Sequence, residues 1–112
     1  MNDSKLDSKW KGLTQKEWRR ELQALLLISD VALERAIIRI WEQQTYSEQA
    51  SGMSIIVDGV GFNKFDAPLM SKYARQLATK QHLSKYQCSV ARKKMPKYWR
   101  QLMNISKEIH GW

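Results

Sequence analysis

The order of apolar and polar positions predicts a chain built mainly from amphipathic helices. Between residues 14 and 45 apolar side chains recur every three or four positions, the spacing that gathers them on one helical face. Thr14 followed by Glu17 has the spacing of a capping box at a helix start. Ser29 and Asp30 either end one helix and cap the next or form a polar step, and the pattern favours one long, bent helix. After Thr45 the helical pattern stops, and TYSEQASGMS is typical of a loop.

The middle of the chain predicts a short β-hairpin. Two β-prone runs, at residues 55–57 and 60–62, flank Asp58 and Gly59, a pair suited to a two-residue hairpin turn. The glycines do not complete a dinucleotide-binding fingerprint, because Lys64 stands at the third position. Gly61 is therefore expected to allow close backbone packing, with a phosphate contact from this loop beside Lys64 as the alternative.

The C-terminal half predicts two further helices, at residues 66–80 and 84–109. Asp66 is the expected N-cap of the first, with Pro68 in its first turn, and Ser84 with Gln87 forms a second capping box. Pro96 interrupts the last helix, but the apolar stripe keeps its phase across the proline, which favours a kink over a break. The stripe consists of Ala91, Met95, Tyr98, Leu102, Ile105 and Ile109.

These elements predict a mainly α fold of three to four helices with a short β-hairpin insertion around residues 54–63. Residues 1–12 are polar and are expected to form a flexible tail. Residues 13–112 then make a single helical domain, within the size range of one small domain. It combines nearly neutral N-terminal helices (14–45) with basic C-terminal helices (66–80 and 84–109).

Charge is distributed unevenly along the chain. Residues 1–63 carry eight Lys/Arg and nine Asp/Glu, a net charge of −1, whereas residues 64–112 carry eleven and two, a net charge of +9. Such asymmetry indicates a polyanionic partner. DNA is preferred, with RNA also open; the alternatives are an acidic surface on a host protein and a basic face that only promotes solubility.

A short phrase nearly recurs, as KYARQL at residues 72–77 and KYWRQL at 97–102, with a partial echo, KEWRREL, at 16–22. In each full copy the tyrosine and leucine are four positions apart and face inward, and the lysine and arginine are three apart and face outward. Repeat architectures show several units at a fixed period, so the phrase reads as a two-sided helical turn rather than a duplication.

The predicted nucleic-acid site is the outward basic face of the C-terminal helices. Lys93, Lys97 and Arg100 lie opposite the apolar stripe and can neutralise phosphates. Trp99 borders this face; burial against the first helix is the favoured reading, and stacking on an unpaired base is the alternative. The full set of expected contact residues is Lys72, Arg75, Arg92, Lys93, Lys94, Lys97 and Arg100.

Catalysis, a metal and a cofactor are not expected. His82 and His110 are far apart in sequence, and the basic half holds only two acids. A single cysteine, Cys88, excludes an intramolecular disulfide and indicates a reducing, cytoplasmic location. The longest apolar run, residues 24–28, is too short for a membrane span, and the N-terminus lacks a secretory signal, so no membrane association is expected.

Four stretches between residues 43 and 102 carry a resemblance: QTYSEQASG, DGVGFNKFDA, ARQL and LSKYQCSVARKKMPKYWRQL. Together they resemble a family of small uncharacterised proteins and appended segments in bacteria, phages and plasmids. The resemblance implies a discrete domain of phage or plasmid association, found beside DNA-processing enzymes, and it supplies no catalytic residues. A phage- or plasmid-encoded protein that modulates a host protein through the same basic surface is the alternative function. A helical oligomer with a tryptophan-rich interface is a third.

Overall fold

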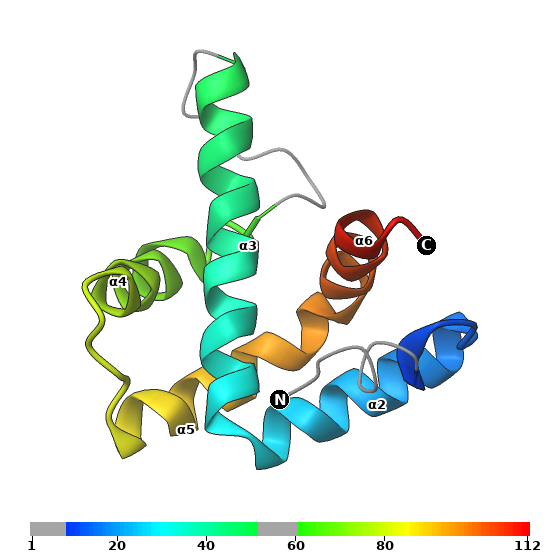
Figure 1. The fold of residues 1–112 in the computed structure, drawn as a ribbon. Helices are drawn as coiled ribbons and strands as arrows, with labels where there is room; N and C mark the ends of the chain where they lie inside the picture. The colour runs from blue at the N-terminus through cyan, green and yellow to red at the C-terminus, as the bar shows by residue number, and fades with distance from the viewer. Residues whose placement is uncertain (1–8, 52–60) are drawn as a thin grey trace.

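One long helix, α3, forms the axis against which the other helices pack (Figure 1). The computed structural model describes residues 9–51 and 61–112, and for residues 46–51 it describes the backbone only. α4 and α6 lie on opposite sides of α3. The structure is mainly helical, which confirms the predicted mainly α fold class. The helices are α2 (Gln15–Ile28), α3 (Asp30–Ser51), α4 (Ala67–Ala78), α5 (Lys85–Lys94), the 3-10 helix η1 (Met95–Tyr98) and α6 (Trp99–His110).

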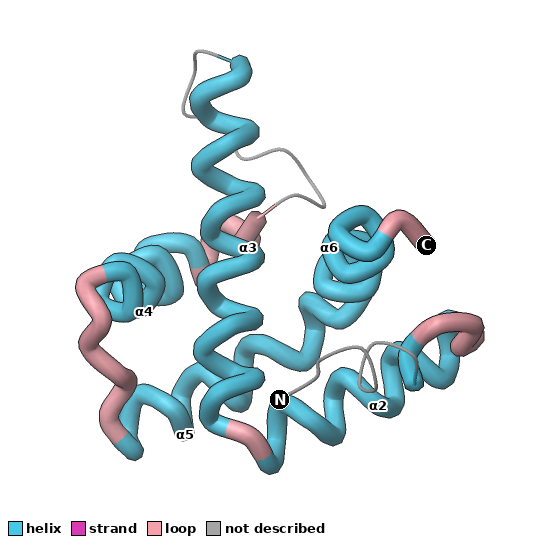
Figure 2. Tube along the Cα trace, in the orientation of Figure 1, coloured by secondary structure: helices cyan, strands magenta, loops and turns pink. Residues whose placement is uncertain are grey.

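The expected hairpin at residues 54–63 falls mostly in residues 52–60, outside the described residues. At its described end, Gly61 and Phe62 form a bend, and Figure 2 shows only helices and loops in the described part of the chain. The side-chain oxygen of Asn63 accepts hydrogen bonds from the backbone N–H groups of Phe65, at 3.0 Å, and Asp66, at 2.8 Å. This Asx-type turn directs the chain into α4, so the strand expected to end at Phe62 is not formed there.

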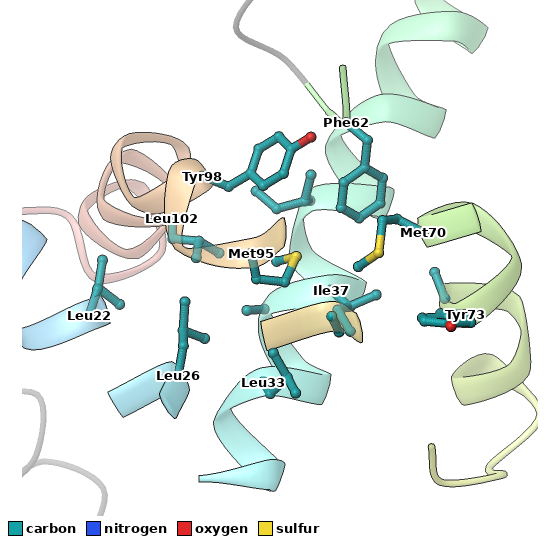
Figure 3. Packing of buried hydrophobic residues seen from close by; sticks show 14 of the residues in the cluster. Leu22, Leu26, Leu33, Ile37, Phe62, Met70, Tyr73, Met95, Tyr98 and Leu102 are labelled. Carbon is teal, nitrogen blue, oxygen red and sulfur yellow. The ribbon is translucent and has the colours of Figure 1, made fainter. Parts of the chain in front are cut away.

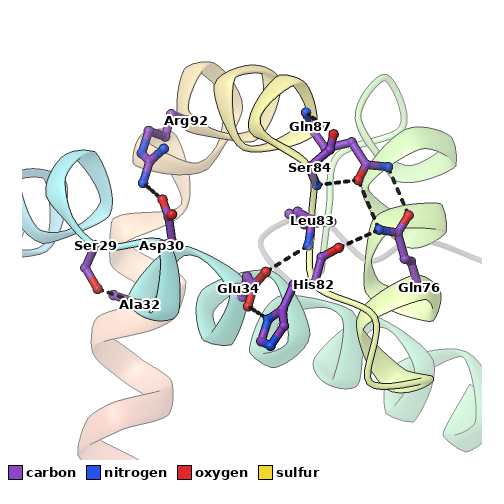
Figure 4. Close-up of polar contacts among 10 residues, drawn as sticks. All are labelled: Ser29, Asp30, Ala32, Glu34, Gln76, His82, Leu83, Ser84, Gln87 and Arg92. Carbon is purple, nitrogen blue, oxygen red and sulfur yellow. Dashed lines mark hydrogen bonds and ion pairs between the residues drawn. The ribbon is translucent and has the colours of Figure 1, made fainter.

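The first helical region consists of two helices, and the single bent helix expected there is wrong. Ser29 has an extended backbone (φ −121°, ψ 116°) and separates α2 from α3. Its hydroxyl accepts a hydrogen bond of 3.1 Å from the backbone N–H of Ala32 (Figure 4), which favours a new helix start. α3 also continues beyond its expected end at Thr45. The Thr45 hydroxyl donates to the carbonyl of Trp41, a bond that polar side chains make inside helices.

Both predicted capping boxes are confirmed. At the start of α2 the Thr14 hydroxyl accepts from the N–H of Glu17, and the Glu17 carboxylate accepts from the N–H of Thr14. At the start of α5, Ser84 and Gln87 exchange the same pair of bonds. Each box satisfies backbone N–H groups that lack partners within the helix.

Polar side chains hold the loop between α4 and α5 against α3 (Figure 4). One oxygen of Glu34 accepts the backbone N–H of Leu83 at 2.9 Å, and the other lies 2.8 Å from Nδ1 of His82. The amides of Gln76 and Gln87 bond each other in both directions, at 2.9 and 3.0 Å. The start of α5 is thereby fixed relative to both α3 and α4.

Pro96 breaks the last helical region, and the expected kink is wrong. α5 ends at Lys94, a turn of 3-10 helix follows, and α6 runs in a different direction (Figure 1). Proline has no backbone N–H and its ring crowds the preceding turn, which ends the regular helix. The side-chain amide of Gln23 on α2 donates to the Pro96 carbonyl at 3.1 Å and satisfies one acceptor at this break.

The core lies where α2, α4 and the C-terminal helices meet α3 (Figure 3). Leu33 and Ile37 of α3 are completely buried, and Phe62 meets Tyr98 edge to face, with ring centroids 5.4 Å apart. The apolar stripe of the C-terminal helices is buried as predicted up to Ile105. Ile109, one turn further, is 54% exposed, so its expected burial is wrong. Other buried members of the core are Leu22, Leu26, Met70, Tyr73, Met95 and Leu102.

The expected flexible tail is described only in part, because residues 1–8 lie outside the described residues. Trp10 packs against the core, and its ring centroid is 4.9 Å from that of Trp18. The described end of the tail therefore contributes an aromatic side chain to the packing around α2.

Gly61 brings the backbone before α4 into contact with α3 and α6. The amide of Gln101 accepts from the Gly61 N–H at 2.8 Å and donates to the Gly61 carbonyl at 3.0 Å. The next N–H, of Phe62, donates to Gln44 on α3 at 3.1 Å. Gly61 has φ +81°, and a Cβ there would lie 2.5 Å from Cβ of Gln44. Both the conformation and the space require glycine.

Gly61→Ala should therefore lower the free energy of unfolding by about 2–4 kcal/mol, from positive-φ strain and the clash with Gln44. Gly12→Ala is the matched control, because Gly12 has φ +87° but a Cβ there meets nothing within 4 Å. The control should cost only about 1 kcal/mol. Urea denaturation measures both, and equal losses in the two variants would contradict the close packing at Gly61.

Candidate nucleic-acid interface

The structure divides the predicted contact residues into those with and those without an acidic partner. Lys94 and Lys97 bond to Asp66, and Arg92 bonds to Asp30. In the described part of the chain the remaining members, Lys72, Arg75, Lys93 and Arg100, are exposed and form no ion pair. The two groups have different roles.

Asp66 is a buried carboxylate surrounded by three donors. It is only 3% exposed, and it accepts hydrogen bonds from the Tyr98 hydroxyl at 2.7 Å, Lys97 Nζ at 2.8 Å and Lys94 Nζ at 3.3 Å. The Tyr98 oxygen in turn accepts the backbone N–H of Asn63 at 3.1 Å. Asp66 stands at the N-cap position of α4, but its side chain makes no capping bond, so the expected capping role is wrong.

The surroundings of Asp66 keep its charge. Burial acts to raise the pKa of Asp66, but hydrogen bonds from Lys97, Tyr98 and Lys94 outweigh it and hold that pKa below its ordinary value. Burial and the bond to Asp66 raise the pKa of the Tyr98 hydroxyl, which therefore stays protonated. Two lysines thus neutralise one buried carboxylate and tie the start of α4 to the 94–98 segment.

Arg92 is also a structural side chain. It pairs with Asp30 at the start of α3 (Figure 4). Its Nε donates to the carbonyl of Leu26, in the last turn of α2, at 3.1 Å. The Arg92 side chain is only 24% exposed. Its guanidinium satisfies an end-of-helix carbonyl and holds α5 against the α2–α3 junction.

Trp99 is half-buried and has an arginine from each of two helices over its ring, in cation–π contacts. Arg19 of α2 has its Cζ 6.0 Å from the ring centroid, and Arg100 of α6 has its Cζ 5.2 Å from it. The distance between the two Cζ atoms therefore cannot exceed the sum of these two distances to the centroid. Both arginines are exposed, and neither forms an ion pair with a described residue. We call Arg19, Trp99 and Arg100 the arginine–tryptophan site.

The packing of α2 brings the arginine–tryptophan site together. Along residues 92–100, Arg92 meets Leu26, the carbonyl of Pro96 meets Gln23, and Trp99 meets Arg19. α2 therefore runs antiparallel to this segment. Lys93 lies exposed on the same segment.

The other two unpaired members of the predicted set, Lys72 and Arg75, lie on α4. This helix packs on the opposite side of α3 from α6 (Figure 1), so the pair is separated from Arg100. The two KYxRQL phrases therefore present their basic residues in different places.

Arg19 was missing from the predicted site because it belongs to the electrically neutral half of the chain. The echo KEWRREL at residues 16–22 was the available signal, since it repeats an outward basic group beside an inward aromatic. Asp66 was missed as an organising residue. Its signal was charge: it is one of only two acids among residues 64–112.

Comparisons with models of protein families, with curated proteins and with solved structures give no match. Within the two described ranges, no group of three or more His, Cys, Asp or Glu side chains is placed to hold a metal ion. In the part of the chain that the structure describes, no helix combines the length and the apolar character needed to cross a membrane. The geometry of the basic surface is therefore the basis for a functional proposal.

Asp66→Asn should lower the free energy of unfolding by about 2 kcal/mol at pH 7, because two lysines lose their buried carboxylate. The native pKa of Asp66 is lowered, so the unfolded chain binds more protons near pH 4 and the contribution of Asp66 is lost as pH falls below that value. The gap between wild type and Asp66→Asn should shrink on acidification from pH 7 to about pH 3.

Urea denaturation of both proteins at the two pH values measures this gap. Asp30→Asn is the control, because the Asp30 side chain is 71% exposed and its loss should cost less. A gap of equal size at both pH values would show that the Asp66 charge does not stabilise the fold.

Proposed function

We propose that this chain binds nucleic acid, DNA preferred, without catalysing a reaction, and that the arginine–tryptophan site with Lys93 makes the contact. The observation that carries the proposal is one half-buried indole beside two exposed guanidiniums from different helices, neither paired with a described acid. Such a site offers two guanidinium groups that can bind phosphates, and an indole on which a base can stack when an arginine moves off its face.

Electrostatics favours an anion at this position. Each guanidinium carries a full positive charge, so a phosphate placed between them is attracted by both. Guanidinium groups bind phosphate oxygens through two parallel hydrogen bonds, and each neutralised phosphate releases counterions. Lys93 extends the cationic surface along residues 92–100.

The indole favours single-stranded nucleic acid over an intact duplex. A base can stack on Trp99 only when one of its faces is not already stacked on a neighbouring base, as in a single strand, and such stacking depends little on sequence. The proposal is therefore a non-catalytic accessory protein that holds a single strand through its backbone and one or more bases. A phage or plasmid origin, implied by the sequence resemblance, is part of this proposal.

A second candidate function is binding to a host protein, and exposed apolar side chains favour it. At the α2–α3 junction Leu27 is 59% exposed, Ile28 81% and Val31 58%. Clustered apolar side chains on a surface are typical of protein contacts. In this alternative the basic surface docks on an acidic protein face and modulates that protein.

The double reversal Arg19→Glu/Arg100→Glu should weaken binding to single-stranded DNA at least about tenfold and lower the slope of log K against log salt by about two. Fluorescence anisotropy with labelled single-stranded DNA, duplex DNA and RNA, at about 50 and 200 mM salt, measures both effects. Lys72→Glu/Arg75→Glu is the matched control, because it changes the net charge equally on α4.

Trp99→Ala adds a test of stacking and should weaken single-strand binding by about 1–3 kcal/mol while changing duplex binding less. If the α4 control abolishes binding and the Arg19/Arg100 variant does not, the proposed surface is wrong. If wild type binds none of the three nucleic acids at low salt, the host-protein alternative replaces this proposal.

A further inference from the structure

A pocket of about 180 Å³ lies between α2 and the C-terminal end of α6, and its walls are mainly aromatic. Trp18 of α2, Trp10 before it and Trp112 at the chain end all line it. Leu25 of α2 and Ser106 of α6 lie on its wall as well. We call this the tryptophan pocket; it shares no residue with the arginine–tryptophan site.

The rings around the tryptophan pocket are already ordered against each other. The centroid of Trp18 is 4.9 Å from that of Trp10 and 6.4 Å from that of Trp112, and His110 stacks on Trp112 at 4.5 Å with planes 23° apart. An incoming ring can therefore contact rings that already hold each other in place, which lowers the entropic cost of binding.

One donor on a pocket-lining residue has no partner. The indole Nε1 of Trp18 is buried, and it has no hydrogen-bond acceptor in the described structure. A buried N–H left without an acceptor costs about 1–3 kcal/mol. Ser106 lines the pocket and offers a hydroxyl that can donate to an acceptor on a ligand, and an acceptor that displaced the atoms covering the Trp18 N–H would also remove this cost.

We propose that the tryptophan pocket binds one neutral, planar aromatic molecule whose edge carries a hydrogen-bond acceptor. Size supports one ring system, since an engineered cavity of about 150 Å³ in another protein binds benzene. Stacking on indoles adds to apolar burial for an aromatic ligand and not for a saturated one.

A cationic ligand is disfavoured in this pocket. No carboxylate side chain lines it, and the ammonium group of Lys9, which pairs with Glu21 at 3.6 Å, already lies 5.8 Å from the ring centroid of Trp10. A cationic ligand would have to share the ring of Trp10 with this ammonium group. The same neutral ring chemistry is found in a free aromatic small molecule and in a nucleobase, and the experiment distinguishes these sources.

Isothermal titration calorimetry with two probes tests the proposal: indazole as a free aromatic molecule and thymidine as a nucleobase source. At least one should bind wild type, and cyclohexanol, a saturated ring with a hydroxyl, should bind at least about tenfold more weakly than that probe. Leu25→Trp, which fills the pocket from a partly exposed position, should abolish binding. Ser106→Ala, which leaves the space open, should weaken it by about two- to tenfold.

Indazole binding alone indicates a free small molecule, and thymidine binding indicates a base; either supports the proposal. Failure of both probes at millimolar concentration, or undiminished binding by Leu25→Trp with a native circular dichroism spectrum, overturns it. Arg19→Glu/Arg100→Glu should leave probe binding unchanged. This readout separates failure of the pocket from failure of the proposed nucleic-acid function.

Discussion

The charge of one buried carboxylate organises the C-terminal half of this protein. Asp66 gathers the ammonium groups of Lys94 and Lys97 and the hydroxyl of Tyr98 at 2.7–3.3 Å. The same tyrosine oxygen accepts a hydrogen bond from the backbone N–H of Asn63. Two residues earlier, the backbone N–H of Gly61 donates to the side chain of Gln101. The segment before α4 is thereby fixed to the segment around η1, and the direction in which α6 leaves Pro96 depends on that connection.

The same ion pairs also determine which basic side chains have no acidic partner among the described residues. A surplus of basic residues in one half of a sequence suggests a continuous binding face, but three of the expected residues neutralise carboxylates of their own chain. The arginines beside Trp99 have no such acid. They meet because α2 lies antiparallel along residues 92–100, held by Gln23 and by Arg92. The proposed surface is therefore a product of helix packing more than of charge density along the sequence.

Features that depend on neighbours in sequence were predictable. The capping boxes at Thr14 and Ser84 and most of the apolar stripes follow from spacing alone, because a helix repeats every 3.6 residues. Local chemistry also decided two features that the pattern misjudged: the hydroxyl of Ser29 starts a new helix, and that of Thr45 bonds back within one. Polar residues at such positions suit a cap, a loop or a helix surface equally well, so spacing could not separate these outcomes.

Features that depend on distant parts of the chain were not predictable in the same way. The stretches DGVGFNKFDA and ARKKMPKYWRQL, which carry much of the sequence resemblance, meet at Gly61–Gln101 and at Asp66–Lys97. Nothing in either stretch alone shows that Asp66 faces lysines instead of capping α4. Arg19 likewise joins Arg100 only through the tertiary placement of α2, which no local pattern encodes.

The most direct test of the proposed surface is an NMR titration of ¹⁵N-labelled protein with a short oligothymidine at low salt, observed through the five tryptophan indole N–H signals. The proposal predicts that the Trp99 indole signal shifts most among the five, accompanied by the backbone amides of Arg19 and Arg100, while the amides of Lys72 and Arg75 on α4 stay in place. Shifts confined to α4, or a Trp99 signal unchanged at saturation, would contradict binding at the arginine–tryptophan site.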